Sequence, residues 1–247
     1  MKNRAQGRTK CFLVLLAMLS LLLPSLAAAD DTVRITGCYS DLEYVVESGD
    51  LVGFEFFIVY SGQGYYLFYQ ESVGEPDTPQ LLPVKVDGNK ISFKLQSDPS
   101  DYGAFKGTIS ADGLTGKFMN ADYPVELQRK ESYWGGKTEE LRIAGCYSNM
   151  EYSEDSGDLT GYELFIVYAR DRYYILYQAS AGEPAAPRLF SVAAEDALKN
   201  AAISFMLPPG DPQPGEFTAA ITATGLSGTF SGTGERIELK RKDSYWQ

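Results

Sequence analysis

The chain contains one long stretch twice, and this internal repeat constrains the fold more than any other feature of the sequence. Gly37–Pro79 matches Gly145–Pro187 at an offset of 108 positions, and Ile91–Trp134 matches Ile203–Trp246 at an offset of 112. A four-residue insertion within Ala193–Ala202, which has room for one helical turn at most, explains the change of offset. A unit of about 100 residues is large enough for its own core, so each copy is predicted to be a domain.

The repeat sets the predicted domain boundaries. Residues 30–134 form the first repeat and 141–247 the second. The six residues between them, 135–140, read GGKTEE, and short polar segments of this kind are typical of linkers.

The first 29 residues are predicted to be a secretory signal peptide. A basic start is followed by the apolar run Phe12–Leu23 and by the small residues Ala27, Ala28 and Ala29. The apolar run is shorter than the roughly 20 residues of a membrane-spanning helix, so a retained anchor is the less favoured alternative. We therefore expect an exported protein, periplasmic or secreted, without stable membrane insertion.

Charge and residue types exclude several functions. Without residues 1–29 the chain has 18 basic and 33 acidic residues, a net charge of −15, and no run of Lys or Arg that could follow a phosphate backbone. We therefore expect no nucleic-acid partner. The sequence contains no histidine and, after residue 29, only two cysteines, so histidine-based triads and zinc sites are not expected. The prediction is a non-enzymatic protein without cofactor, metal or catalytic residues.

Hydrophobic alternation predicts an all-β fold. Ile91, Phe93 and Leu95 alternate with polar residues, as half-buried strands do, and the second copy repeats the pattern. Turn signals such as Ser48-Gly49-Asp50 separate the runs. Each repeat is expected to form eight strands, and for the first repeat they lie near residues 33–45, 51–60, 64–72, 80–86, 90–96, 103–110, 114–119 and 123–130. Tight connections favour two tandem antiparallel up-and-down β-barrels, because closure removes exposed sheet edges.

Two short signatures per repeat resemble those of the lipocalin and calycin barrels. That family opens with Gly-x-Trp on the first strand and carries an arginine on the last strand that packs over the Trp. Gly37-Cys38-Tyr39 and Arg129 occupy these positions in the first repeat, with Tyr in place of Trp, and Tyr147 and Arg241 in the second. The resemblance implies an eight-stranded lipocalin-like barrel whose end is closed by the Tyr–Arg pair, through cation–π contact and hydrogen bonding. The Ser-Tyr-Trp endings also resemble those of uncharacterised bacterial exported domains, which imply no function.

Strand parity places the two cysteines on the outside of the barrels. Val33, Ile35, Gly37 and Tyr39 share one side of the first strand, so Cys38 points the other way, as does Cys146 in the second repeat. In an oxidising compartment Cys38 and Cys146 could form a disulfide between the repeats. The alternative is two separate thiols packed in an interface.

The second and third strands of each repeat are apolar on both faces, so both faces should be covered. We expect the repeats to pack against each other through these hairpins with approximate two-fold symmetry. An exposed aromatic patch for a protein partner or a carbohydrate is the alternative. The candidate residues of the inter-repeat face are Phe54, Phe56, Tyr60, Tyr162, Leu164 and Tyr168.

A few polar residues are candidates for a pocket at the barrel mouth. Glu55 and Glu163 lie within aromatic-rich strands, where a carboxyl group could act as an acid, fill a structural or ligand-binding role, or point to solvent. Gln70 and Gln178 have the same alternatives. The full candidate set is Tyr39, Glu55, Gln70, Arg129, Tyr147, Glu163, Gln178 and Arg241.

These observations predict an exported binding or interaction protein. A small apolar ligand is one candidate partner, but bulky inward side chains tend to fill an eight-stranded barrel, which favours a protein partner or surface contact. A proteinaceous inhibitor of a hydrolase is the alternative, and a carboxylate-based hydrolase the third.

Overall fold

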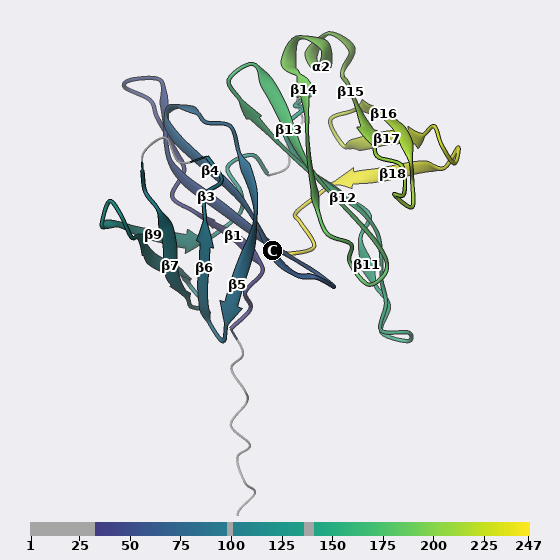
Figure 1. Cartoon of the computed structure of the whole chain (residues 1–247). Helices are drawn as coiled ribbons and strands as arrows, with labels where there is room; N and C mark the ends of the chain where they lie inside the picture. Colours follow the sequence, from purple (N-terminus) through teal and green to yellow (C-terminus); the bar gives the residue numbers. More distant parts are fainter. Residues whose placement is uncertain (1–32, 98–100, 136–140) are drawn as a thin grey trace, which may run out of the picture. The chain divides into compact units, whose positions relative to one another are not determined.

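The computed structural model describes residues 33–97, 101–135 and 141–247, and Val33–Gln247 forms one compact unit (Figure 1). The predicted signal peptide, the predicted linker beyond Gly135 and the short stretch 98–100 lie outside the described residues. Two antiparallel β-barrels make up the unit, one from each repeat, which confirms the predicted fold class.

The first barrel is closed. Its strands follow one another around the sheet, and β1 closes the ring by pairing with both β9 and β3. The strands are β1 (Gly37–Ser40), β2 (Glu43–Val45), β3 (Asp50–Ser61), β4 (Gly64–Pro76), β5 (Gln80–Asp87), β6 (Lys90–Lys94), β7 (Ala104–Ile109), β8 (Gly113–Phe118) and β9 (Tyr123–Arg129).

The second barrel has the same order but is not fully closed, because β14 and β15 flank a gap without strand pairing. The helix α2 (Ala194–Asn200) lies between these two strands in the chain and packs on both. The strands are β10 (Gly145–Ser148), β11 (Glu151–Tyr152), β12 (Leu159–Ala169), β13 (Arg172–Gly182), β14 (Arg188–Ala193), β15 (Ala202–Leu207), β16 (Gly215–Ile221), β17 (Gly225–Phe230) and β18 (Arg236–Arg241).

Two details differ from the sequence prediction. The expected first strand is split into β1 and β2. Within the described residues, each repeat therefore forms nine strands where eight were expected. The inserted segment forms a seven-residue helix, nearly two turns, where one turn was expected. The residue after the helix, Ala201, has a left-handed conformation and begins the turn into β15.

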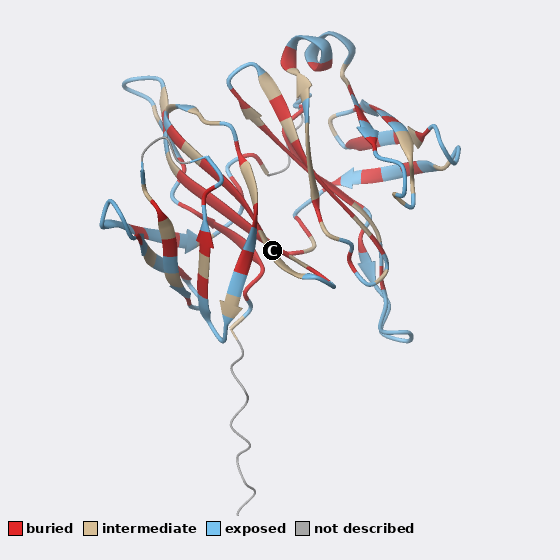
Figure 2. Cartoon of the chain, viewed as in Figure 1, coloured by how far each residue is buried: buried red, intermediate tan, exposed pale blue. Residues whose placement is uncertain are grey.

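The barrel interiors are filled by apolar side chains, as the alternation predicts. Figure 2 shows the buried residues in red along the strands of both barrels. In the first barrel Phe56 and Phe105 are fully buried, with ring centroids 5.4 Å apart, and Phe93 stacks on Phe105 at 4.9 Å. In the second barrel Phe205, Phe217 and Phe230 form the corresponding cluster. Aromatic rings of this size occupy the space that a swallowed ligand would need.

The predicted turns are present between the strands. Val46–Gly49 turns between β2 and β3, and Gly62-Gln63 between β3 and β4. No helix among the described residues is long and apolar enough to cross a membrane.

Candidate functional site

The two barrels meet at a contact that we call the seam, formed by the outward faces of β1, β3 and β4 and of β10, β12 and β13. Phe57 and Phe165, equivalent residues of the two repeats, contact each other with ring centroids 4.9 Å apart. Phe68 adds an edge-on contact to Phe165 at 5.6 Å. All three are buried, and they belong to the hydrophobic cluster that continues into the core of the second barrel. The two repeats therefore pack against each other through these aromatic rings.

Equivalent glutamines exchange contacts across the seam. The Gln70 side-chain amide donates to the Tyr168 carbonyl at 3.3 Å, and Gln178 donates to the Tyr60 carbonyl at 2.8 Å. Tyr168 is the equivalent of Tyr60, and Gln178 of Gln70, so each repeat gives and receives the same hydrogen bond. Reciprocal contacts of this kind are the mark of a two-fold interface, as predicted.

The Ser-Tyr-Trp segment after each last strand supplies polar partners within the seam. Glu55 accepts hydrogen bonds from the Ser132 hydroxyl at 2.5 Å and from the Tyr133 backbone N–H at 2.9 Å. The Trp134 indole N–H donates to the Gln70 side-chain oxygen at 2.7 Å. This polar cluster therefore links the end of the first repeat to the outward face of its own barrel.

The second repeat reproduces the same polar cluster. Glu163 accepts from the Ser244 hydroxyl and from the Tyr245 N–H, and the Trp246 indole donates to Gln178 at 2.8 Å. Burying polar groups is costly unless they are hydrogen-bonded. Here the Ser-Tyr-Trp segments provide those bonds, which gives these segments a structural role.

Both glutamates are inaccessible to solvent. Glu55 is 1% exposed and Glu163 is 3% exposed, and burial raises the pKa of each carboxyl group above its usual value, while the hydrogen bonds from Ser132 and Ser244 lower it in part. Neither faces a barrel mouth. Their prediction as mouth residues, shared with Gln70 and Gln178, is wrong: all four point out of the barrels into the seam.

The cysteines point out of the barrels as predicted, and of the two alternatives for them the structure shows free, buried thiols and not a disulfide. Burial is the main cause that raises the pKa of each thiol, and Cys38 also hydrogen-bonds to Glu55, as Cys146 does to Glu163. The alternative of separate thiols packed at the interface describes the structure.

The Tyr–Arg pair closes one end of each barrel. The Arg129 guanidinium lies over the Tyr39 ring at 4.6 Å and donates to the Thr36 carbonyl at 2.8 Å. Arg241 lies over Tyr147 at 4.7 Å in the same way. A Cβ atom at Gly37, where φ is +135°, would lie only 2.5 Å from Arg129, so the arginine needs a glycine there. The predicted cation–π closure is confirmed, and burial raises the pKa of Tyr39 and of Tyr147 to about 12.

Most of the predicted inter-repeat residues lie elsewhere. Phe54 and Phe56 fill the first barrel, and Leu164 is buried in the second. Tyr162 stacks on Tyr177 within the second barrel and hydrogen-bonds to Glu235. Of the predicted face, only Tyr60 and Tyr168 take part, through their carbonyl groups. The predicted alternation of these strands is correct. The prediction assigned the wrong face of the strands to the contact between the repeats, because both faces are apolar.

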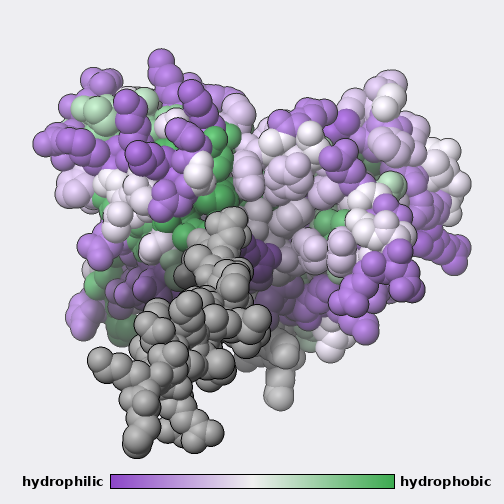
Figure 3. Space-filling model, turned by 90° about the horizontal axis from the view of Figure 1, so that it is seen from below, coloured by the Kyte–Doolittle hydropathy of each residue, from purple (hydrophilic) through white to green (hydrophobic). Residues whose placement is uncertain are grey.

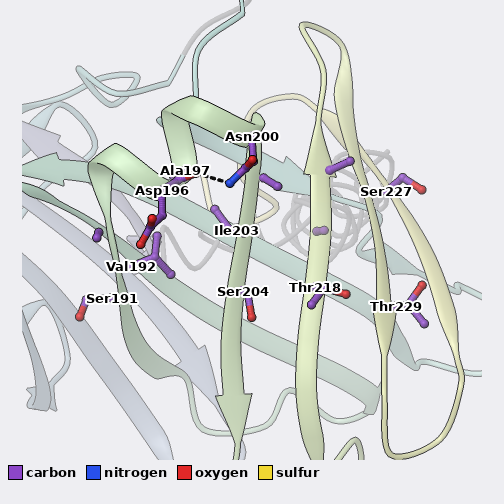
Figure 4. A pocket seen from close by; sticks show the side chains of 14 residues that line it. Ser191, Val192, Asp196, Ala197, Asn200, Ile203, Ser204, Thr218, Ser227 and Thr229 are labelled. Atoms are coloured by element: carbon purple, nitrogen blue, oxygen red, sulfur yellow. Dashed lines mark hydrogen bonds between the residues drawn. The ribbon is translucent and has the colours of Figure 1, made fainter.

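Each barrel also has an open hollow on its outer surface, which the sequence did not indicate. In the second repeat a hollow of about 630 Å³ lies over β14–β17 and α2. Ser204, Thr218, Ser227 and Thr229 line it from the strands, and Asp196 from the helix (Figure 4). Its lining is neutral except for this one aspartate.

The first repeat has a hollow of about 560 Å³ at the equivalent place, over β5–β8. Ser92 and Thr115 line it at the positions of Ser204 and Ser227. Its other lining residues differ in charge and include four lysines, Lys85, Lys90, Lys106 and Lys117. If the two repeats use one scaffold to present two different binding surfaces, we expect hollows at equivalent positions with different lining residues, as observed here.

A third exposed feature is the hairpin that joins β2 to β3 and its counterpart at β11. Tyr44 and Tyr152 are each about half exposed there. Acidic residues lie near both tyrosines in the sequence: Glu43, Glu47, Asp50, Glu151, Glu154, Asp155 and Asp158.

In comparisons with known proteins, no protein-family model and no curated protein matches the chain. Among the described residues, no group of three or more acidic or cysteine side chains is arranged to hold a metal ion. The face of the molecule seen in Figure 3 is mostly hydrophilic, with apolar areas between the hydrophilic ones.

Proposed function

We propose that the chain is an exported, non-enzymatic binding protein that holds its ligand on the outer surfaces of two lipocalin-like barrels. The observation that carries this proposal is the pair of hollows, about 630 and 560 Å³, at equivalent positions of the two repeats. Hollows of this size accommodate small ligands or short segments of a polymer. Export rests on the predicted signal peptide.

The filled interiors of the barrels argue against a function as a carrier of apolar ligands. Phe56, Phe105 and Phe118 are fully buried in the first barrel, and Phe217 and Phe230 in the second. A swallowed ligand would have to displace these rings from a close-packed core. Binding on the outside requires no such rearrangement.

The seam speaks against the carboxylate-based hydrolase. A catalytic carboxyl group has to reach its substrate, whereas Glu55 and Glu163 are buried and each accepts two hydrogen bonds from its own Ser-Tyr-Trp segment. Their raised pKa follows from burial between the barrels.

Two measurements on the exported chain test this function. Nile red, a neutral apolar dye, should show no fluorescence increase with the native protein, because the interiors are filled. In NMR spectra, titration with a panel of short anionic and neutral glycans should shift amide signals of β5–β8 or β14–β17. Dye binding in the interior, or glycan shifts confined to the seam, would contradict the proposal.

A protein inhibitor of a hydrolase is the second candidate, and the acidic hairpins favour it. Tyr44 and Tyr152 each present a half-exposed ring on a hairpin with an acidic sequence, a combination that suits a basic cleft on a partner. If this is the function, Tyr44→Ala and Tyr152→Ala together should abolish inhibition of a sensitive hydrolase and leave the fold intact. Inhibition that survives both changes would exclude the hairpins as the inhibitory element.

A further inference from the structure

We propose that the hollow of the first repeat binds an acidic polysaccharide through a lysine face, which we define as Lys85, Lys90, Lys94, Lys106 and Lys117. This inference rests on the proposed function and names the ligand class for one of its two surfaces. All five side chains are exposed and project from the outer surface of β5–β8. Four of them line the hollow itself.

Strand register places three of these lysines in one row. Lys85 pairs with Ser92, Ser92 with Lys106, and Lys106 with Lys117. Because neighbouring strands lie about 4.8 Å apart, the row runs across four strands and spans about 15 Å. That length exceeds a single small anion and suits successive charges along a chain-like ligand.

The lysine face concentrates positive charge within an acidic repeat. Residues 30–134 hold eight basic residues, and five of them are on this face. Among the described residues only Lys117 of the five has an ion pair, to Asp122 at 2.6 Å. The other acidic side chains on this surface are Asp87, opposite Lys90, and Glu126, opposite Thr115.

The lysines of this row are not needed to stabilise the barrel. Lys106 and Lys117 are directly opposite each other on adjacent strands, and like charges in that position destabilise a sheet. The second repeat has Thr218 and Thr229 at these two positions, again paired across the strands, and forms the same sheet. The barrel therefore does not need the lysines, and an anionic ligand would relieve their repulsion.

The other side chains of the hollow favour a glycan over other polyanions. Ser92, Thr108 and Thr115 place hydroxyl groups between the lysines, where they can exchange hydrogen bonds with sugar hydroxyls. No aromatic side chain lines the hollow, so nucleic-acid bases would find no surface to stack on. The acidic remainder of the protein repels polyanions only weakly at this face, because salt screens charges beyond about 8 Å at physiological ionic strength.

The test is a binding titration with a fluorescent decamer of galacturonate, followed by anisotropy at low and high salt. Wild-type protein should bind it, and high salt should weaken the binding. The variant Lys106→Thr with Lys117→Thr takes the residues of the second repeat and should lose affinity about 25-fold, since each lysine near a polyanion contributes about a factor of five. Its stability to urea should be unchanged or higher, because the repulsion between the two lysines is gone.

The control variant, Lys199→Thr with Lys240→Thr, removes the same charge from the second repeat outside its hollow. Its affinity for the galacturonate decamer should stay within about twofold of wild type. Equal losses in both variants would mean that net charge alone governs binding, and the lysine face would then not be a site.

Competing polyanions decide the ligand class. Polyglutamate and oligothymidylate of equal charge should bind more weakly than the galacturonate decamer. If either binds more tightly through Lys106 and Lys117, the glycan assignment is wrong; absent or lysine-independent binding of galacturonate overturns the proposal altogether. If galacturonate does not bind through the lysines but a neutral glycan shifts amides of β15–β17, the proposed function stands and this inference fails.

Discussion

On the seam the two repeats place the same side chains in the same roles, whereas on their outer faces they do not. Glu55 and Glu163 accept the same pair of hydrogen bonds, and Trp134 and Trp246 donate to equivalent glutamines. On the outer surface, Lys106 and Lys117 of the first repeat correspond to threonines in the second. Each of these seam residues has a buried hydrogen-bond partner that constrains its identity. Residues on the outer surface lack this constraint and can differ between the repeats according to the ligand.

The aromatic contact at the centre of the seam should show the largest effect. Phe57→Ala and Phe165→Ala each remove a buried ring and should lower the free energy of unfolding by about 3–5 kcal/mol. Because the two rings touch, the double variant should lose less than the sum of the single losses. Urea denaturation measures all three.

Tyr44→Ala is the matched control for this prediction, since the Tyr44 ring is half exposed and the Phe57 and Phe165 rings are buried. It should change the free energy of unfolding by about 0.5 kcal/mol at most. Additive losses at Phe57 and Phe165 would show that the barrels are not coupled through this contact.

The indole hydrogen bonds of Trp134 and Trp246 test whether the seam is equivalent in the two repeats. Trp134→Phe and Trp246→Phe keep an aromatic ring but leave the side-chain oxygen of Gln70 or Gln178 without its indole donor. Each change should cost about 1–3 kcal/mol, because a buried acceptor is left unpaired. The costs should be similar in the two repeats; a large effect in only one would break the equivalence of the seam. Thermal or urea unfolding gives the values.

The buried glutamates predict a smaller, pH-dependent effect. Burial raises the pKa of Glu55 and Glu163 in the folded state, so the folded protein binds these protons more tightly than the unfolded chain does. Their contribution to stability is therefore full below the ordinary pKa of 4.5 and is lost as the pH rises through the raised pKa.

Glu55→Gln and Glu163→Gln remove this titration. Relative to wild type, each variant should become more stable as the pH rises from 4 to 8, and both should do so by similar amounts. Urea midpoints measured across this pH range test the prediction. A stability difference that does not change with pH would mean that the carboxyl groups titrate normally.

Much of the fold could be predicted from the sequence, because the determining signals are local. Alternation such as that of Ile91, Phe93 and Leu95 fixes a strand and its buried face, and the repeat fixes the number of barrels. The closure of each barrel by Tyr39 with Arg129, and by Tyr147 with Arg241, followed from the two short signatures at these positions.

The seam could not be predicted in the same detail, since Phe54 and Phe57 give β3 two apolar faces and alternation alone does not rank them. Glu55 and Gln70 could have indicated which face of these strands forms the seam. A carboxylate and an amide on one face of neighbouring apolar strands need buried polar partners, and Ser-Tyr-Trp, present at the end of both repeats, supplies them. The hollows depend on how several neighbouring strands curve together in three dimensions, which no local pattern contains.

NMR mapping of the protein with the galacturonate decamer tests most directly whether the repeats share a seam and differ in their binding surfaces. The account predicts amide shifts at β5–β8, around Lys106 and Lys117, with no shift at the equivalent β15–β17 and none at the seam. Equal shifts in both repeats, or shifts centred on the seam, would contradict it.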